Sequence, residues 1–160
     1  MRKTREVIGF VFNLAAAIAA ASVSAVAADG KGGGTATYVM THIGDRPVAG
    51  GNMLGQDHLK GVMLADGGTG PFHLAVHDCL SSMVAGPDGA PQQINGVCDA
   101  IDKDGDVFWM WFHNQGETHV WTFMGGTGKF DGITGGGTTK ELASKPDRLV
   151  ISWEGSWKMK

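Results

Sequence analysis

Short runs rich in Val, Thr, Trp and Phe alternate with Gly, Asp, Asn and Pro along the chain after residue 28. Such runs are typical of β-strands separated by tight turns. No segment in this part carries the i, i+3, i+4, i+7 apolar pattern of an amphipathic helix over three turns. The chain has 26 glycines without a collagen period, so we interpret them as turn residues between strands. The sequence therefore predicts an all-β fold.

The spacing of these runs predicts eight strands, which suits a small closed antiparallel β-barrel, with a compact sandwich as the alternative. The segment Gly44–Gln56 has no clear pattern, and we interpret it as a mobile lid over one end of the fold. The expected strands are Thr35–Ile43, His58–Ala65, Pro71–Cys79, Ile94–Asp102, Val107–His113, Thr118–Met124, Gly132–Glu141 and Leu149–Trp157.

The N-terminus has the features of a secretory signal peptide. Basic residues at positions 2, 3 and 5 precede an apolar, Ala-rich stretch that ends in the small residues Ala25-Val26-Ala27-Ala28. A membrane span is the alternative for a stretch of this length, but a cleavage site follows it directly. We predict a signal peptide over residues 1–28, a single β-barrel domain over 29–160, and a periplasmic or secreted protein without stable membrane insertion after cleavage.

The charge of the predicted domain argues against a nucleic-acid partner. The signal peptide would remove three of the 13 basic and one of the 16 acidic residues, which leaves 10 against 15 and a formal charge of −5. A mildly acidic surface repels nucleic acid and anionic membranes.

Cys79 and Cys98 are the two cysteines of the chain, and export into an oxidising compartment favours a disulfide between them. If this bond joins neighbouring antiparallel strands, Asp78 lies opposite Asp99, on the face that carries Phe72 and Leu74. We predict that this face is the interior.

The turns then set the remaining register. A two-residue hairpin turn at Asp104-Gly105 would place Asp99 opposite Met110, and a four-residue connection over 114–117 would place Met110 opposite Trp121. His119 falls on the same face. The predicted lining for a ligand consists of Phe108, Met110, Phe112, Trp121 and Phe123.

Asp78, Asp99 and His119 form the predicted catalytic cluster. Carboxylates opposed at about 5 Å on a partly dry face repel, so one would keep its proton toward neutral pH and act as a general acid or base. His119 would relay that proton or bind a substrate oxygen. The alternatives are that these residues lie at a wetted barrel mouth, or that the register differs.

The same register turns Trp109 and Trp111 outward, and we predict self-association into a homo-oligomer through that face. A register slipped by one residue would turn both tryptophans inward as a wall for ligand stacking.

The run GGTGKFDGITGGG at Gly125–Gly137 resembles the glycine-rich GTGKF segment of the barrel shared by dirigent proteins and allene oxide cyclases, including bacterial secreted relatives. The aromatic strands before it and the closing strand with Trp153, Gly155 and Trp157 fit the same pattern. The resemblance implies the barrel fold. Dirigent proteins steer the coupling of phenoxy radicals and allene oxide cyclases close a fatty-acid epoxide into a ring, but their functional residues have no matching positions here.

The sequence predicts neither a metal site nor a cofactor. His73 and His77 share a strand face but lie about 13 Å apart at ~3.3 Å per residue, too far for one ion. The run Asp102-Lys103-Asp104-Gly105-Asp106 resembles the start of a calcium loop, yet Val107 stands where that loop needs glycine, so we interpret the run as a hairpin turn. Gly128-Lys129 lacks the spacing of a phosphate-binding loop.

Three functions remain open. The first is an exported barrel that binds a small apolar or aromatic molecule in its interior. The second is a cofactor-free isomerase, cyclase or lyase that uses the acid and base cluster in the same interior. The third is a structural or envelope-interaction protein whose interior is filled by side chains.

Overall fold

The structure is a computed structural model, and it describes residues 29–115 and 118–160. The predicted signal peptide at 1–28 lies outside the described residues. Within the described ranges, no helix is long and apolar enough to cross a membrane.

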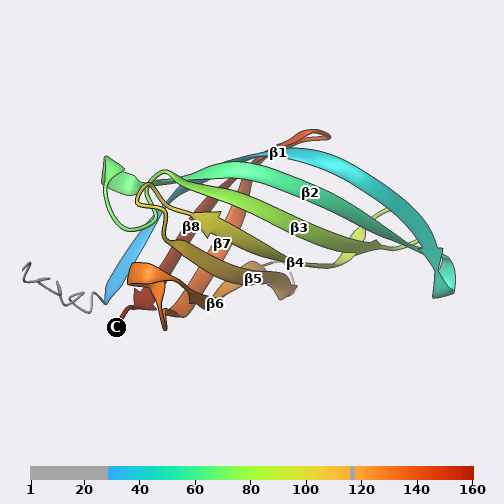
Figure 1. The fold of residues 1–160 in the computed structure, drawn as a ribbon. Coiled ribbons are helices and arrows are strands. Elements are labelled where there is room, and N and C mark those ends of the chain that lie inside the picture. The colour runs from blue at the N-terminus through green and yellow to red at the C-terminus, as the bar shows by residue number, and fades with distance from the viewer. Residues whose placement is uncertain (1–28, 116–117) are drawn as a thin grey trace, which may run out of the picture.

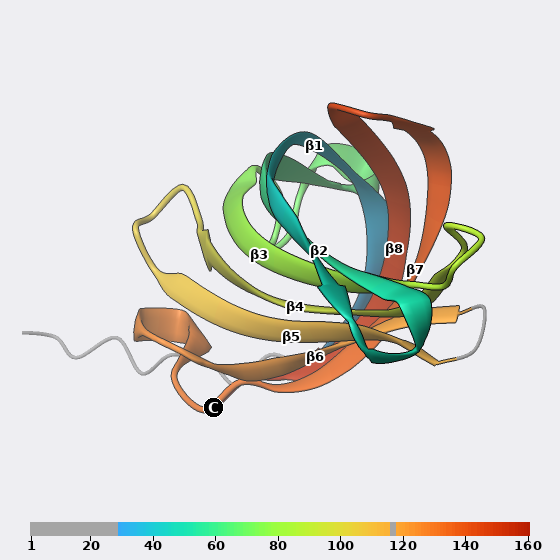
Figure 2. The same cartoon turned by 90° about the vertical axis from the view of Figure 1, so that its right-hand side faces the viewer.

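Eight antiparallel strands close into a barrel in sequence order, with β1 paired to β8, as Figures 1 and 2 show. The predicted closed eight-stranded barrel is confirmed. Single 3-10 turns join β1 to β2 (η1, Ala49–Gly51), follow β2 (η2, Asp66–Gly68) and precede β7 (η3, Gly128–Phe130). The strands are β1 Gly30–Val48, β2 Asn52–Ala65, β3 Ala75–Ala85, β4 Pro91–Ile101, β5 Val107–Gln115, β6 Thr118–Gly126, β7 Thr134–Lys145 and β8 Arg148–Lys158.

The segment predicted as a lid, Gly44–Gln56, is instead the tip of the β1–β2 hairpin. Its residues continue the strand pairing from Gly44 opposite Gln56 to Val48 opposite Asn52, after a register shift between His42 and Gly44. Pro47 obscured this strand in the sequence. Proline is tolerated here because β1 pairs with β8 only as far as Val39, which leaves the outer edge of the tip without a partner strand.

The β4–β5 turn differs by one residue from the prediction, and this difference decides which face is buried. Ile101 pairs with Val107, and the amide of Gly105 donates to the Asp102 carbonyl at 3.1 Å. Gly105 has φ 89°, as expected for a three-residue hairpin loop that ends in a left-handed glycine. The predicted two-residue turn is wrong.

This one-residue change reverses the faces of β3 and β4. The β3–β4 register itself is as predicted, with Asp78 opposite Asp99 and Cys79 opposite Cys98. However, Cys98 now pairs with Met110 on the inner face, and Asp99 pairs with Trp109 on the outer face. The predicted inward orientation of Asp78 and Asp99 is therefore wrong, and the disulfide faces the interior.

Aromatic side chains fill the end of the barrel that holds the C-terminus. Phe72 lies between β2 and β3 and packs within 5.2 Å of the Phe108 ring and 5.7 Å of the Phe130 ring, measured between centroids. All three side chains are at most 2% exposed. The predicted strand over Pro71–Cys79 begins only at Ala75, because the chain turns at Leu74 (φ 64°) to place Phe72 in the core.

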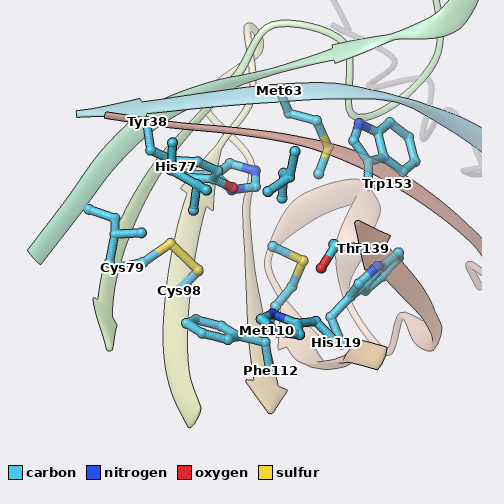
Figure 3. A pocket seen from close by; sticks show the side chains of 14 residues that line it. Tyr38, Met63, His77, Cys79, Cys98, Met110, Phe112, His119, Thr139 and Trp153 are labelled. Atoms are coloured by element: carbon cyan, nitrogen blue, oxygen red, sulfur yellow. A yellow bond between two sulfur atoms is a disulfide. The ribbon is translucent and has the colours of Figure 1, made fainter. Parts of the chain in front are cut away.

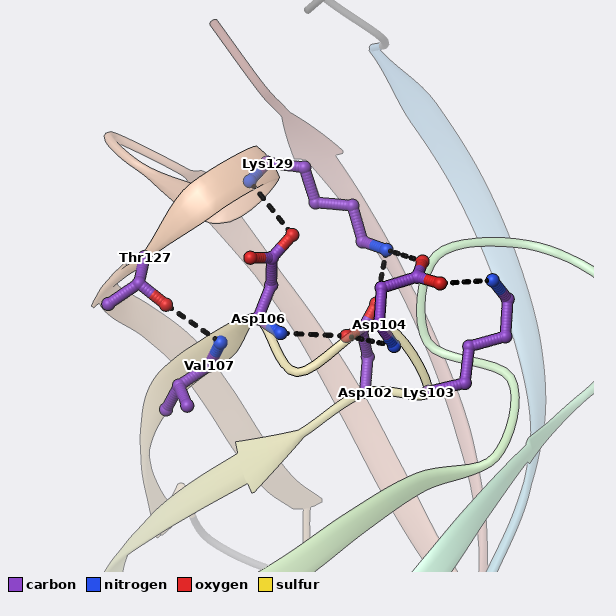
Figure 4. Close-up of polar contacts among 7 residues, drawn as sticks. All are labelled: Asp102, Lys103, Asp104, Asp106, Val107, Thr127 and Lys129. Carbon is purple, nitrogen blue, oxygen red and sulfur yellow. Dashed lines mark hydrogen bonds and ion pairs between the residues drawn. The ribbon is translucent and has the colours of Figure 1, made fainter.

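The GTGKF segment has a structural role in this end of the barrel. Phe130, at its end, is fully buried, and Lys129 forms an ion pair with the buried Asp102 and donates to Asp104 at 2.7 Å (Figure 4). The Lys129 amide also donates to Asp106 at 3.2 Å. The run Asp102–Asp106 forms a hairpin turn, and the Lys129 ammonium pairs with two of its aspartates.

Candidate functional site

A cavity of about 100 Å³ lies inside the barrel, between the aromatic end and the β5–β6 connection. Phe112, His119 and Leu149 are half-buried and lie near the strand ends at this second end, so the cavity extends toward it. Its walls come from all eight strands and are mostly apolar, and Figure 3 shows the side chains pointing into it. The lining residues are Tyr38, Leu59, Met63, His77, Cys79, Cys98, Met110, Phe112, His119, Trp121, Thr139, Leu149, Ile151 and Trp153.

Tyr38 and His77 form a buried polar pair in this wall. The Tyr38 hydroxyl lies 3.0 Å from His77 Nδ1, and the side chains are 6% and 1% exposed. Burial lowers the pKa of His77 from 6.5 to about 4 and raises the pKa of Tyr38. At neutral pH the imidazole and the phenol are both uncharged.

The tautomer of His77 follows from the number of buried groups that each neutral form leaves without a hydrogen-bond partner. If Nδ1 carried the proton, the Tyr38 hydroxyl would have no acceptor among the described residues, and Nε2 would be a bare acceptor. If Tyr38 donates to Nδ1, only the Nε2–H donor is left without a partner. The second arrangement leaves fewer buried groups unsatisfied, and it is therefore favoured.

Two N–H donors in the cavity wall consequently lack acceptors. His77 Nε2 and Trp153 Nε1 are both buried and have no hydrogen-bond partner in the described part of the chain. A buried unpaired donor costs about 1–3 kcal/mol, so such groups call for an explanation. By contrast, the indole N–H of Trp121 donates to the Thr138 carbonyl at 3.3 Å. An apolar cavity with a few polar groups in its wall is the usual form of a small-molecule site.

The five residues predicted to line a ligand site divide into two groups. Met110, Phe112 and Trp121 line the cavity. Phe108 and Phe123 belong to the aromatic end beneath it, where Phe108 is fully buried against Phe72 and Phe130. All five face inward, as predicted. The β5–β6 pairing places Met110 opposite Phe123 instead of Trp121, which is a shift of two residues. A shift of two residues leaves every side chain on the same face of the sheet.

The predicted catalytic cluster is not assembled. His119 lines the cavity, but Asp78 and Asp99 lie on the outer surface beside Trp109. The Asp78 side chain is 48% exposed, forms an ion pair with His58, and lies 3.2 Å from Lys60. The hydrogen bond from His58 leads the contacts that lower the pKa of Asp78. Asp78 is thus an ionised surface group.

The predicted disulfide is present between Cys79 and Cys98, with 4.0 Å between the Cα atoms. Trp109 and Trp111 are each 41% exposed on the outer face. The alternative register that would turn them inward is not the one observed. Self-association through this face stays a prediction.

Sequence reasoning missed Tyr38, His77 and Trp153. Residues two apart in a strand point to the same face of the sheet, so His77 shares the face of Cys79. In the structure, Tyr38 pairs with Gly61 and Leu149 and lies on the inner side of β1. Finding His77 from the sequence required knowing that the disulfide faces inward.

Comparison with protein-family models found no match, and comparison with the curated proteins found none either. Solved structures do match in fold. The pterocarpan synthase dirigent protein GePTS1 aligns with a TM-score of 0.61 and 8% identity, over 83% of this chain and 91% of that one. The pterocarpan synthase dirigent protein PsPTS1 aligns with a TM-score of 0.57 and 10% identity, over 83% of this chain and 95% of that one. The fold is a dirigent-like β-barrel.

Proposed function

We propose that the barrel binds a small, mainly aromatic molecule in the interior cavity, and that this molecule carries a hydrogen-bond acceptor. The observation that carries the proposal is the pair of unpartnered N–H donors, His77 Nε2 and Trp153 Nε1, in an otherwise apolar wall. An acceptor oxygen on the ligand would satisfy a donor whose isolation costs free energy in the empty protein.

The size of the cavity limits the buried part of the ligand. An apolar cavity of about 150 Å³ holds benzene, so the smaller cavity of about 100 Å³ here limits the buried part of the ligand to at most about one aromatic ring. The half-buried side chains of Phe112, His119 and Leu149 would allow the rest of a larger molecule to extend toward the β5–β6 end of the barrel. The side chains of Trp121 and Trp153 would report binding by fluorescence.

The test is incubation of the protein with a metabolite extract, followed by mass spectrometry of the free and protein-bound fractions. The parent is compared with Tyr38→Phe/His77→Leu, which removes both polar partners together. A compound retained unchanged by the parent and not by the variant supports a binding function. Equal retention by both proteins would contradict the role of His77.

A second candidate function is a cofactor-free isomerase, cyclase or lyase in the same cavity. Two observations favour it: the neutral His77, which is held by Tyr38 and offers a ring nitrogen to the cavity, and the likeness in fold to proteins described as pterocarpan synthases. In this version His77 replaces the outward-facing aspartates as the group that moves a proton. A compound consumed by the parent and left intact by the variant would select this function.

We also propose that the chain is exported to the periplasm or secreted. The disulfide supports this proposal, because such bonds persist in oxidising compartments. The remaining alternative, a structural or envelope-interaction protein, predicts that no compound is retained or consumed.

A further inference from the structure

The cavity wall contains a concentration of soft metal ligands beside the disulfide. One ring nitrogen of His77 and the sulfurs of Cys79 and Cys98 lie within 4.8 Å of one another, and all three residues are buried. Met110 is the direct strand neighbour of Cys98, and Figure 3 shows the Met110 and Met63 sulfurs among the lining side chains. Thiolate sulfur and imidazole bind both Cu(I) and Zn²⁺, and the neighbouring thioether sulfurs, which are not among the usual zinc ligands, favour Cu(I).

We propose that reduction of the disulfide converts this wall into a Cu(I) site formed by His77, Cys79 and Cys98, with Met110 as the adjacent thioether. This site goes beyond the proposed ligand-binding function and does not depend on it. In the oxidised protein the sulfurs are bonded to each other and are not available as thiolates, so the redox state of the disulfide decides whether the metal site can form.

The chemistry balances with a dithiol or phosphine as the reductant. A dithiol supplies two electrons and two protons and is itself oxidised to a disulfide. A phosphine supplies the two electrons, and water supplies the two protons and the oxygen atom of the phosphine oxide. In both cases the S–S bond breaks and two thiols form. Cu(I) then displaces both thiol protons, and two Cu–S bonds form without a further change in oxidation state. Metal binding therefore releases two protons.

The geometry around the three donors suits a metal ion. Metal–sulfur bonds near 2.3 Å at tetrahedral angles place two sulfurs about 3.8 Å apart. Cys79 and Cys98 are directly opposed, with Cα atoms 4.0 Å apart, so rotation about the side-chain bonds can reach this separation without moving the strands.

The second coordination shell is also present. His77 Nε2 has no partner among the described residues, so it could bind the metal once its proton moves to Nδ1, from which the N–H would donate to the Tyr38 hydroxyl 3.0 Å away. Metal-binding histidines commonly have their second nitrogen fixed in this way, and loss of such an outer partner costs about 10–100-fold in metal affinity.

The experiment is a titration of Cu(I), delivered from a colorimetric Cu(I) chelator without oxygen, into oxidised protein and into protein reduced with a phosphine that is then removed. We expect one equivalent of Cu(I) bound by the reduced form and an affinity at least roughly 100-fold lower for the oxidised form. The variants His77→Gln and Met110→Leu are compared with Met124→Leu, which removes an exposed methionine from the outer surface.

Loss of Cu(I) affinity in His77→Gln by about 10-fold or more, with Met124→Leu equal to the parent, supports the site. Equal affinity of the oxidised and reduced forms would overturn it, as would unfolding of the reduced protein or preferential binding of Zn²⁺. Failure here is distinct from failure of the ligand-binding function, because that function is tested on the oxidised protein with organic compounds.

Discussion

The burial of His77 predicts a specific loss of stability in mild acid. The side chain is 1% exposed, and burial lowers its pKa from 6.5 to about 4. In the unfolded chain the imidazole takes up a proton as the pH falls below 6.5, whereas in the folded barrel it stays neutral until about pH 4. The unfolded state therefore binds more protons between these values, and stability falls as the pH is lowered through this window.

The magnitude follows from the two pKa values. Each pH unit between them is worth 1.36 kcal/mol, so His77 contributes about 3 kcal/mol of stability at pH 7 that is lost by pH 4. For a domain of this size such a change is a large share of a total stability of about 5–15 kcal/mol.

Urea unfolding between pH 7 and pH 4 measures this contribution. The comparison is Tyr38→Phe against Tyr38→Phe/His77→Leu, since neither protein then leaves a buried tyrosine hydroxyl without its partner. All other titrating groups are common to both proteins, so the difference isolates His77. We expect the unfolding free energy of the protein with His77 to fall by about 3 kcal/mol more over this range.

Parallel pH profiles for the two proteins would refute the reasoning. They would show that His77 is solvated or protonated in the folded barrel. The buried Nε2–H donor without a partner, on which the ligand hypothesis depends, would then be absent.

Three further predictions concern the ion pair, the packing and the outer face. Asp102→Asn should lower the unfolding free energy by about 1.5–3 kcal/mol in urea, because a buried carboxylate loses its charge-assisted contact with Lys129, while Asp104→Asn at the exposed neighbour should cost less than about 1 kcal/mol. Gly155→Ala should lower the melting temperature because a Cβ there would overlap the Trp121 ring, whereas Gly44→Ala, with open space around it, should not. Sedimentation of the parent at micromolar concentration should show an oligomer that Trp111→Arg dissociates, and a monomeric parent would contradict self-association.

The fold could be predicted from the sequence because short strands separated by glycine-containing turns are compatible with few folds other than an antiparallel barrel or sandwich. Eight short apolar runs in about 130 residues define the number of strands, and hairpin connections define their order. The β3–β4 register also followed correctly from Cys79 and Cys98. What the pattern could not show was the length of each strand, since Pro47 and the glycines near it disguise the continuation of β1 and β2.

The candidate site was harder to predict because a change of one residue in the length of a hairpin loop decides which side of a strand points into the barrel. A three-residue loop ending at Gly105 and a two-residue turn at Asp104-Gly105 fit the same letters, yet they place opposite faces of β4 in the core. The wrong choice directed attention to Asp78 and Asp99 and away from His77. Both alternating sets of β3 residues mix apolar and polar side chains, with Ala75 and His77 in one set and Val76 and Asp78 in the other, so composition could not correct the error.

The most direct test of the proposed site is a tryptophan-fluorescence titration of the oxidised protein with acetophenone and with ethylbenzene. The two compounds have similar size and shape, but only acetophenone offers a carbonyl acceptor. We expect acetophenone to bind about 10-fold more tightly, as one net hydrogen bond of about 1.4 kcal/mol requires, and we expect Tyr38→Phe/His77→Leu to abolish this preference. Equal binding of both compounds by the parent, or the same preference in the variant, would contradict recognition of an acceptor by His77.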